Sequence, residues 1–497
     1  MVAATQAETN AVSASEPSLT ISDKLRNAYG LGQFAEGVTN ESFAIFLLFF
    51  YREVQGLPGA LAGLSLLISL CIDAITDPLV GKLSDRTRTR WGRRHPFMFA
   101  AAIPWALSHY LAFTPPQGLS TTGLFVWLAV TASCARLAMT FFFVPHMALG
   151  AELSDDHEER TRIVSVRMFW SRMGGAAPGV LGFLWFMRPT PAFENGQLNP
   201  QAYPGYALAT ATLVALPVLF TVFSTRHTIP YLQRRQEAAS AEGLFGSLVQ
   251  DAKACARLHN FRVHFFGGLV AYTAWGIVGT LTLHLATYFW RIDTALLVIW
   301  GFCLFLGIFV GLFFWSALAP RFEKRSMFVV GLGIFITFTA PPILCKALGF
   351  WPPRDSALYL PLFLGTTGFA AHFGIAATMV TGGSMMADVS DEDELLNGSR
   401  RQGVFFGALA FASKAAVGLG AQVGGLLVDQ ARLVPGTDPE LVPAEIANTL
   451  ALWTGLSVAI LATFSMVLFS RYSLTRSRHR AIAEALASRA GAAPLAP

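Results

Sequence analysis

Asp73 and Asp77 are two acidic residues, four positions apart, inside the apolar stretch 58–80, with Thr76 between them. Side chains at positions i and i+4 share one face of a helix. A charge at the centre of a membrane-crossing helix costs ~2.5–3.5 kcal/mol, and two neighbouring anions also repel each other. The pair therefore requires a bound cation, a proton or a basic partner. Because hard cations prefer oxygen ligands, Asp73, Thr76 and Asp77 form a candidate site for Na⁺ or H⁺.

Asp77 also has a simpler interpretation, because it lies close to the basic segment 82–94, KLSDRTRTRWGRR. An arginine of this segment can pair with Asp77 at the membrane surface. Asp73 lies one helical turn further into the stretch, where an ionisable side chain is by default a candidate functional group. Pro78 follows Asp77 directly and weakens the backbone hydrogen bonding around the pair.

Lys414 is a basic partner for these carboxylates from a distant part of the chain. It lies near the middle of the apolar stretch 402–428, in GALAFASKAAVGLG, where an unpaired ammonium is costly. We expect Lys414 to neutralise Asp73 and Asp77 when no cation is bound and to release them when a cation arrives. The alternative is a purely structural salt bridge.

The elements that must position these residues are membrane-spanning helices. The 497-residue chain is 53% hydrophobic and only 13% charged, its mean hydropathy is +0.49, and these values lie outside the range of soluble domains. Apolar stretches long enough to cross a ~30 Å hydrocarbon core recur along it. The sequence predicts an all-α membrane protein with twelve spans: 34–55, 58–80, 97–114, 121–148, 161–187, 205–224, 263–290, 295–318, 327–348, 357–386, 402–428 and 448–470.

The polar segment 226–262 divides these spans into two halves of six, 34–225 and 263–470. Residues 1–33 show no apolar core followed by a cleavage site, so we expect a cytosolic N-terminal segment and no cleaved signal peptide. Residues 471–497 form the corresponding cytosolic tail.

Basic residues predict the orientation of the chain. Most of the 36 Lys and Arg fall in loops on one side of the twelve-span arrangement. The other side holds only Arg52, Arg188, Arg291, Lys346, Arg354 and Arg432. Because Lys and Arg concentrate in cytoplasmic loops, we expect both termini in the cytoplasm and the chain in the plasma membrane, which is the inner membrane of a bacterium.

Other classes of function find no support in the sequence. The five cysteines show neither disulfide nor metal-ligand spacing, and no motif of a metalloprotease, a phosphate-binding loop or a catalytic nucleophile is present. The arginines of 86–94 are accounted for by membrane orientation, so no nucleic-acid partner is predicted. We expect neither enzyme activity nor a cofactor beyond a coupling ion.

Four ordered motifs resemble the glycoside-pentoside-hexuronide cation symporters, the melibiose-permease-like branch of the major facilitator superfamily. They are YREVQGL, DAITDP followed by RTRWGRRHPF, VPHMALGAELSDDHEERTRI, and ADVSDEDELLNGSRRQGVFFGALAFASK. The resemblance covers most of the chain. It implies the major facilitator fold, with twelve transmembrane helices in two six-helix halves and a solute bound between them.

The resemblance also implies a complete cation site. The cation-binding aspartates of the family fall on Asp73 and Asp77, which would ligate the metal if Na⁺ is the coupling ion. The polar ligand between them falls on Thr76, and the threonine ligand of the fourth helix falls on Thr140. The lysine of the eleventh helix falls on Lys414, the expected coupling residue.

An inner gate is the next feature that the resemblance implies. Asp388, Asp391 and Arg400 match a region in which the family forms gate salt bridges. The alternative is a solvated loop face, because exposed ion pairs contribute only ~0–1 kcal/mol.

The solute side of the resemblance departs from the family pattern. Gly37 and Phe143 stand where the melibiose-type members place sugar-contacting acids, and Met147 and Met168 stand at the neighbouring aromatic and arginine positions. This pattern argues against galactoside recognition. It favours a less hydroxylated or amphipathic solute, a change also found in the vertebrate lysolipid symporters, which share the DAxTDP motif.

Polar side chains that remain nearby are the candidate solute contacts. They are Glu36, Asn40 and Arg167, together with Phe143, whose ring can stack on a solute. For each of them the alternative is ordinary packing or hydrogen bonding between helices.

The leading hypothesis is a cation-coupled secondary active symporter that moves a small organic solute by alternating access. By family the solute is a sugar or glycoside, and the coupling ion is Na⁺ or H⁺. We expect the protein to work as a monomer in contact with membrane lipid. One alternative is a symporter of an amphipathic or lysolipid-like solute, and the other is a non-transporting membrane sensor, against which the intact set of Asp73, Asp77 and Lys414 argues.

Overall fold

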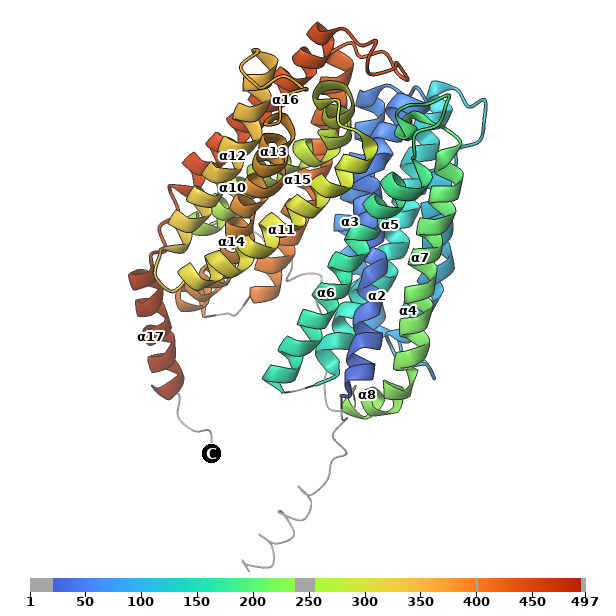
Figure 1. The fold of residues 1–497 in the computed structure, drawn as a ribbon. Coiled ribbons are helices and arrows are strands. Elements are labelled where there is room, and N and C mark those ends of the chain that lie inside the picture. Colours follow the sequence, from blue (N-terminus) through green and yellow to red (C-terminus); the bar gives the residue numbers. More distant parts are fainter. Residues whose placement is uncertain (1–20, 155, 237–254, 399–400, 493–497) are drawn as a thin grey trace, which may run out of the picture.

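Two bundles of long helices stand side by side in the protein (Figure 1). The computed structural model describes residues 21–154, 156–236, 255–398 and 401–492. The first bundle contains α2 (Asp23–Ser42) with η1 (Phe43–Leu47) and η2 (Phe50–Val54), α3 (Gly59–Arg86), α4 (His95–Ala112), α5 (Thr121–Glu152), α6 (His157–Leu181) with η3 (Gly182–Phe186), and α7 (Ala202–Thr225), followed by α8 (Ile229–Gln236). The second contains α10 (His259–His284) with η6 (Leu285–Trp290), α11 (Thr294–Leu318), α12 (Lys324–Ala347), α13 (Tyr359–Phe363), η7 (Leu364–Ala370), α14 (Ala371–Asn397), α15 (Gln402–Gln430) and α16 (Ala444–Phe469), followed by α17 (Arg476–Ala492).

These helical segments account for all twelve predicted spans. Within the described ranges, nine helices are long and apolar enough to cross a membrane. The segments that begin at Asp23, His95 and His157 cover the three remaining predicted spans. The first segment begins at Asp23 rather than near residue 34, since Ser22 caps its N-terminus by accepting a hydrogen bond from the backbone N–H of Leu25. The chain is thus an integral membrane protein with two six-helix halves.

One end of the two bundles is closed by ion pairs between them. We call this the upper end, because it lies at the top of Figure 1, and the opposite end, near α17, the lower end. The Asp429 carboxylate on α15 accepts hydrogen bonds from Arg52 Nε at 3.0 Å and from the backbone N–H groups of Gly59 and Ala60 at 2.8 and 2.7 Å. It therefore caps α3, whose N-terminus favours a negative charge. Arg52 also donates to the carbonyl of Leu433 at 2.6 Å.

A second buried contact lies beside this one. Glu53, whose side chain is fully buried, accepts hydrogen bonds from Tyr288 Oη at 2.9 Å and from the backbone N–H of Gly436 at 3.3 Å. His284 Nε2 lies 3.3 Å from the other carboxylate oxygen of Glu53. Arg52, Glu53 and Asp429 thus form a clamp, called the upper clamp below, that joins the first bundle to the second.

Small residues let α3 and α15 approach closely across the same boundary. A methyl group added at Gly425 would lie 1.9 Å from the carbonyl oxygen of Gly59, and one added at Gly63 would lie 2.6 Å from the carbonyl oxygen of Ala421. Small residues at a helix interface permit this packing in membranes. Gly425 of the eleventh span therefore serves helix packing in the observed conformation.

We expect Gly425→Ala to lower the thermal stability of the protein by several degrees, because its methyl group cannot fit while α3 and α15 remain in contact. Thermal unfolding followed by tryptophan fluorescence measures the change. Gly407→Ala is the matched control on the same helix, since a methyl group there meets open space and alanine favours a helix over glycine by ~1 kcal/mol. Equal melting temperatures for the two variants would contradict the prediction.

Candidate cation and solute sites

Four predicted residues converge where α3, α5 and α15 meet. Thr140 Oγ1 lies 2.7 Å from Asp73 Oδ1 and 3.1 Å from Asp77 Oδ1. Lys414 Nζ lies 2.8 Å from Asp73 Oδ2 and 2.5 Å from Asp77 Oδ2. The lysine comes from the second bundle and both carboxylates come from the first. We call these four residues the cation cluster.

The cluster has one deeply buried and one accessible carboxylate. The Asp73 side chain is 1% exposed, whereas the side chains of Asp77 and Lys414 are each 23% exposed. Asp77 is therefore the more accessible of the two carboxylates, with the Lys414 ammonium beside it. A hydroxyl donates only one hydrogen bond, so Thr140 bonds one carboxylate at a time and keeps oxygen lone pairs for a cation.

The donor set suits a small monovalent cation. Four carboxylate oxygens and one hydroxyl oxygen are hard ligands. Among the described residues, no group of three or more His, Cys, Asp or Glu side chains is placed to hold a metal ion. Asp73, Asp77 and Thr140 can hold Na⁺, and the same carboxylates can hold a proton instead.

The hydroxyl of Thr76 is hydrogen-bonded within its own helix. Its Oγ1 donates to the backbone carbonyl of Asp73 at 3.2 Å, a contact within α3. Its role as a cation ligand stays a prediction. Pro78 lies inside α3 and has no N–H to donate to the carbonyl of residue 74, so that carbonyl lacks its usual helical donor.

The candidate solute contacts meet in a cavity between the bundles. The cavity has a volume of ≈ 260 Å³ and its walls come from α2, α5, α6 and α11. All four predicted contacts line it: Glu36, Asn40, Phe143 and Arg167. Glu41 lines it too, although its spacing of five from Glu36 argues against a shared helix face; the cavity extends around the edge of α2.

The polar wall of the cavity is organised around Glu36. Its carboxylate accepts hydrogen bonds from Gln33 Nε2 at 3.1 Å, from Ser171 Oγ at 3.0 Å and from Asn40 Nδ2. Three donors from α2 and α6 therefore hold one carboxylate in place. Glu36 is fixed before any solute arrives, which favours a preformed site.

A buried arginine and an apolar surface complete the lining. Arg167 is only 5% exposed, lies beside Tyr29, and its Nε has no hydrogen-bond partner among the described residues. Phe143, Met147 and Phe305 supply the apolar part. The cavity thus presents a fixed polar wall and an apolar wall to the same ligand.

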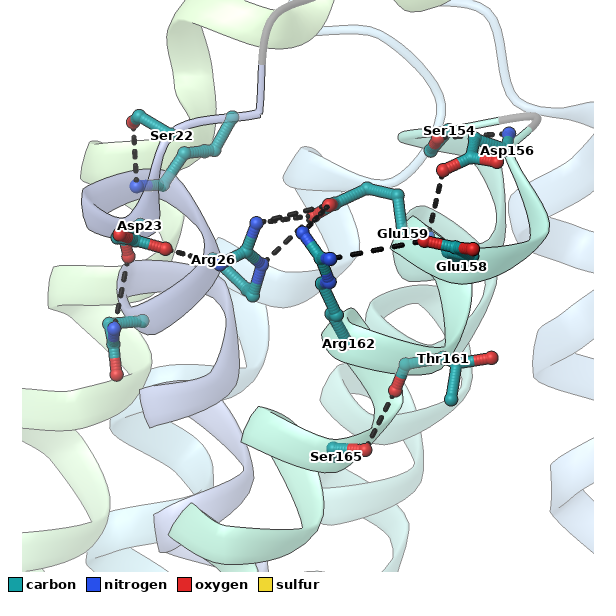
Figure 2. A network of polar contacts seen from close by, with 12 residues as sticks. Ser22, Asp23, Arg26, Ser154, Asp156, Glu158, Glu159, Thr161, Arg162 and Ser165 are labelled. Atoms are coloured by element: carbon teal, nitrogen blue, oxygen red, sulfur yellow. Dashed lines mark hydrogen bonds and ion pairs between the residues drawn. The ribbon is translucent and has the colours of Figure 1, made fainter.

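The lower end of the first bundle is tied together where α2 and α6 begin. Figure 2 shows Arg26 of α2 reaching between Asp23 and Glu159. Arg26 Nε and Nη2 donate to the two Glu159 oxygens at 2.9 and 3.0 Å, and this hydrogen-bonded carboxylate raises the pKa of Arg26. Asp156 caps α6 by accepting from the backbone N–H of Glu159 at 3.0 Å. These contacts hold two cavity walls in register at their lower ends.

The predicted inner-gate residues are partly outside the described ranges. Arg400 lies outside them. Both Asp388 oxygens accept from Lys324 Nζ at 2.7 Å, and His479 Nε2 lies 3.0 Å from Asp391 Oδ2. These contacts join α14 to α12 and α17 within the second bundle, so the gate role of Asp388 and Asp391 stays a prediction.

Several residues of these sites escaped the sequence analysis. Gln33, Ser171 and Phe305 line the cavity. Arg136, by contrast, is recognisable in the sequence as a charged residue inside the fourth span, and it donates to Asn40. Ser171 and Phe305 carry no such signal, because serine and phenylalanine are ordinary residues in membrane helices.

Comparisons with known proteins agree with this architecture. Residues 28–476 match the family model described as MFS/sugar transport protein. The chain is 27% identical to the inner membrane symporter YicJ of Escherichia coli over 94% of this chain and 95% of the relative, and 26% identical to the isoprimeverose transporter of Lactiplantibacillus pentosus over 81% and 79%. It is 24% identical to the sodium-dependent lysophosphatidylcholine symporter 1 of Gallus gallus over 94% and 89%.

A solved structure shows the same fold. The nucleoside transporter NupG superimposes with a TM-score of 0.63 at 15% identity, over 90% of this chain and all of that one. The family and these relatives are transporters rather than enzymes. With a family model matched over most of its length, the chain belongs to the MFS/sugar transport proteins of the major facilitator superfamily.

Proposed function

We propose that this protein is a cation-coupled symporter that moves a small organic solute by alternating access. The observation that carries the proposal is the cation cluster, in which Lys414 of the second bundle holds Asp73 and Asp77 of the first. A cation that binds both carboxylates replaces Lys414 and so removes an ion pair between the bundles. Binding at this point therefore biases the relative position of the two halves, as symport requires.

The orientation follows from the distribution of basic residues. Arg86, Arg88 and Arg90 are exposed beyond the cation cluster at the lower end, and the positive-inside rule places such an end in the cytoplasm. The upper clamp then closes the outer side. We assign the observed conformation to an inward-facing state of a monomer in a plasma membrane, with both termini cytoplasmic and the helix surfaces in contact with lipid.

The solute is proposed to be a sugar or glycoside. The isoprimeverose transporter among the relatives supports this class, and the fixed Glu36 with Asn40 offers groups that bond hydroxyls. The coupling ion is Na⁺ or H⁺, with Thr140 in favour of Na⁺ because it adds an oxygen ligand.

An amphipathic solute is the second candidate. Phe143 and Met147 make one wall of the cavity apolar, and one relative is a lysophosphatidylcholine symporter. A solute with a polar head and an apolar body would use both walls. A non-transporting sensor is the alternative from another class, and it gives no reason to keep the cation cluster.

The cation cluster is tested by titrating the purified protein with Na⁺ at several pH values, with tryptophan fluorescence or calorimetry as the readout. We expect saturable Na⁺ binding that acid weakens, because protons compete for the same carboxylates. Asp73→Asn should raise the Kd at least 100-fold, a loss of about 2.7 kcal/mol, because it removes one of two anionic ligands.

Asp355→Asn, which changes an exposed acid in a loop, is the control and should bind Na⁺ as the wild type does. Proton uptake that disappears in Asp73→Asn, without Na⁺ binding, would identify a proton-coupled carrier. Absence of both responses would contradict the proposal and favour the sensor.

A further inference from the structure

Arg136 is a buried arginine on α5 that stands between the cation cluster and the solute cavity. It is 7% exposed, and its Nη1 donates to Asn40 Oδ1 at the cavity wall. Its charge interacts with that of Asp73 in the cation cluster and with that of Glu36 in the cavity wall. It precedes Thr140 by four residues, so both side chains lie on one face of α5.

The Arg136 charge interacts with two carboxylates, one from each site. Asp73 belongs to the cation cluster, where it also pairs with Lys414, and Glu36 belongs to the wall of the solute cavity. A monovalent cation bound at Asp73 would change the charge on one of these two partners. A buried charge is strongly affected by such a change, because little water screens it.

The guanidinium is not locked to a single partner. Its hydrogen bond goes to a neutral amide, Asn40, and its Nε has no hydrogen-bond partner among the described residues. Both Asp73 and Glu36 attract it. A displacement of the guanidinium towards one carboxylate and away from the other would therefore shift charge stabilisation between the two sites.

We propose that Arg136 is the positioning residue through which the cation cluster and the solute cavity influence each other. The proposal rests on the proposed function. A cation at Asp73 weakens the pull on Arg136 from that side, so the guanidinium bonds Asn40 and Glu36 and arranges the cavity wall. A solute that holds Asn40 and Glu36 with Arg136 keeps the positive charge away from Asp73, and the cation binds more tightly. The two effects are equal by thermodynamic linkage.

The link can be tested with Na⁺ alone, without knowledge of the solute. We expect Arg136→Gln to lower the Kd for Na⁺ roughly 10-fold, because a like charge beside Asp73 is removed. Arg136→Lys keeps the charge and should stay within about threefold of the wild type. Tryptophan fluorescence of the purified full-length protein gives each Kd.

Asn40→Ala gives the decisive measurement, because Asn40 lies in the cavity wall and has no hydrogen bond to the cation cluster. With its acceptor lost, Arg136 turns towards Asp73, and the Kd for Na⁺ should rise roughly 3- to 10-fold. In the Arg136→Gln background the same substitution should leave the Kd unchanged. A purely structural Arg136 predicts neither effect.

Arg354→Gln removes the same charge from an exposed site at the upper end and should not alter the Kd. The proposal is overturned if Asn40→Ala changes the Kd for Na⁺ even in the Arg136→Gln background. It is also overturned if Asn40→Ala alone leaves the Kd for Na⁺ unchanged. This second result is decisive even where Arg136→Gln fails to fold. If the wild type takes up protons instead of Na⁺, the same cycle is measured by proton uptake. If the wild type binds neither Na⁺ nor protons, this proposal and the proposed function are both overturned. If Asp73→Asn abolishes Na⁺ binding but the Arg136 and Asn40 variants leave the Kd unchanged, only the link through Arg136 is overturned.

Discussion

Lys414→Gln is expected to make the stability of the protein depend on Na⁺. Without the ammonium, two carboxylates remain in a cluster where one of them is 1% exposed, and removal of one partner from a buried ion pair costs ~3–5 kcal/mol. In Na⁺-free buffer the melting temperature should therefore fall by several degrees. Because nothing then competes for the carboxylates, Na⁺ should bind roughly 10- to 100-fold more tightly and restore the stability.

Thermal unfolding in 100 mM NaCl and in 100 mM choline chloride separates this effect from ionic strength. Lys24→Gln, which removes an exposed lysine at the start of α2, should unfold at one temperature in both salts. The same unfolding temperature for Lys414→Gln in both salts would mean that Lys414 does not compete with a cation. Transport should be lost in Lys414→Gln even though the ion binds, because nothing displaces the ion again.

Asp429→Ala is expected to open the upper end. The substitution removes a carboxylate that accepts three hydrogen bonds from Arg52, Gly59 and Ala60, and each bond to a charged group contributes ~1.5–3 kcal/mol. Since the Asp429 side chain is 29% exposed, water offsets part of the loss. A net change of about 2–3 kcal/mol shifts the equilibrium between conformations roughly 30- to 150-fold.

Spin labels at Gln201 and Glu445, which are exposed at the starts of α7 and α16, report the width of the upper end in a variant without the native cysteines. We expect a second population with a longer distance in Asp429→Ala. Asp438→Ala, at an exposed loop acid of the same end, should give the wild-type distribution. A single unchanged distance in Asp429→Ala would show that the clamp does not control opening.

The cation cluster could be predicted because charge is conspicuous in a membrane span. Asp73, Asp77 and Lys414 each required a partner, and the structure places them at ion-pair distance although 337 residues separate Asp77 from Lys414. Thr140 does not stand out in this way, since threonine is common in membrane helices. Its place in the cluster was expected only from the resemblance to a family.

The upper clamp could not be predicted, because its charges lie at the ends of spans. Arg52, Glu53 and Asp429 occupy positions where charged residues ordinarily meet water or lipid headgroups. Their pairing depends on how the two halves dock, because Asp429 lies 377 positions after Arg52 in the chain. No local pattern carries that information.

The walls of the cavity were predictable only in part. Helices that are apolar all round carry little amphipathic signal, so periodicity does not identify the face that points inwards. Glu36 and Asn40 were found by their polarity, whereas Phe305 of α11 could not be distinguished from the many phenylalanines that face lipid. The identity of the solute therefore depends partly on apolar lining residues, which the sequence pattern does not identify.

Helix α15 carries both Lys414 and Asp429, and the fifteen residues between them span about 22 Å at the helical rise. Its polar contacts with α3 lie near the two ends of this segment, at Asp429 on the N-terminus of α3 and at Lys414 on Asp73 and Asp77. Under the proposed function, an ion that takes the place of Lys414 leaves the attachment at Asp429 intact. The helix would then pivot about its upper end, so a displacement of about an ångström at the ion becomes a larger displacement at the lower end of α15. The length of α15 would thus amplify the effect of one bound ion.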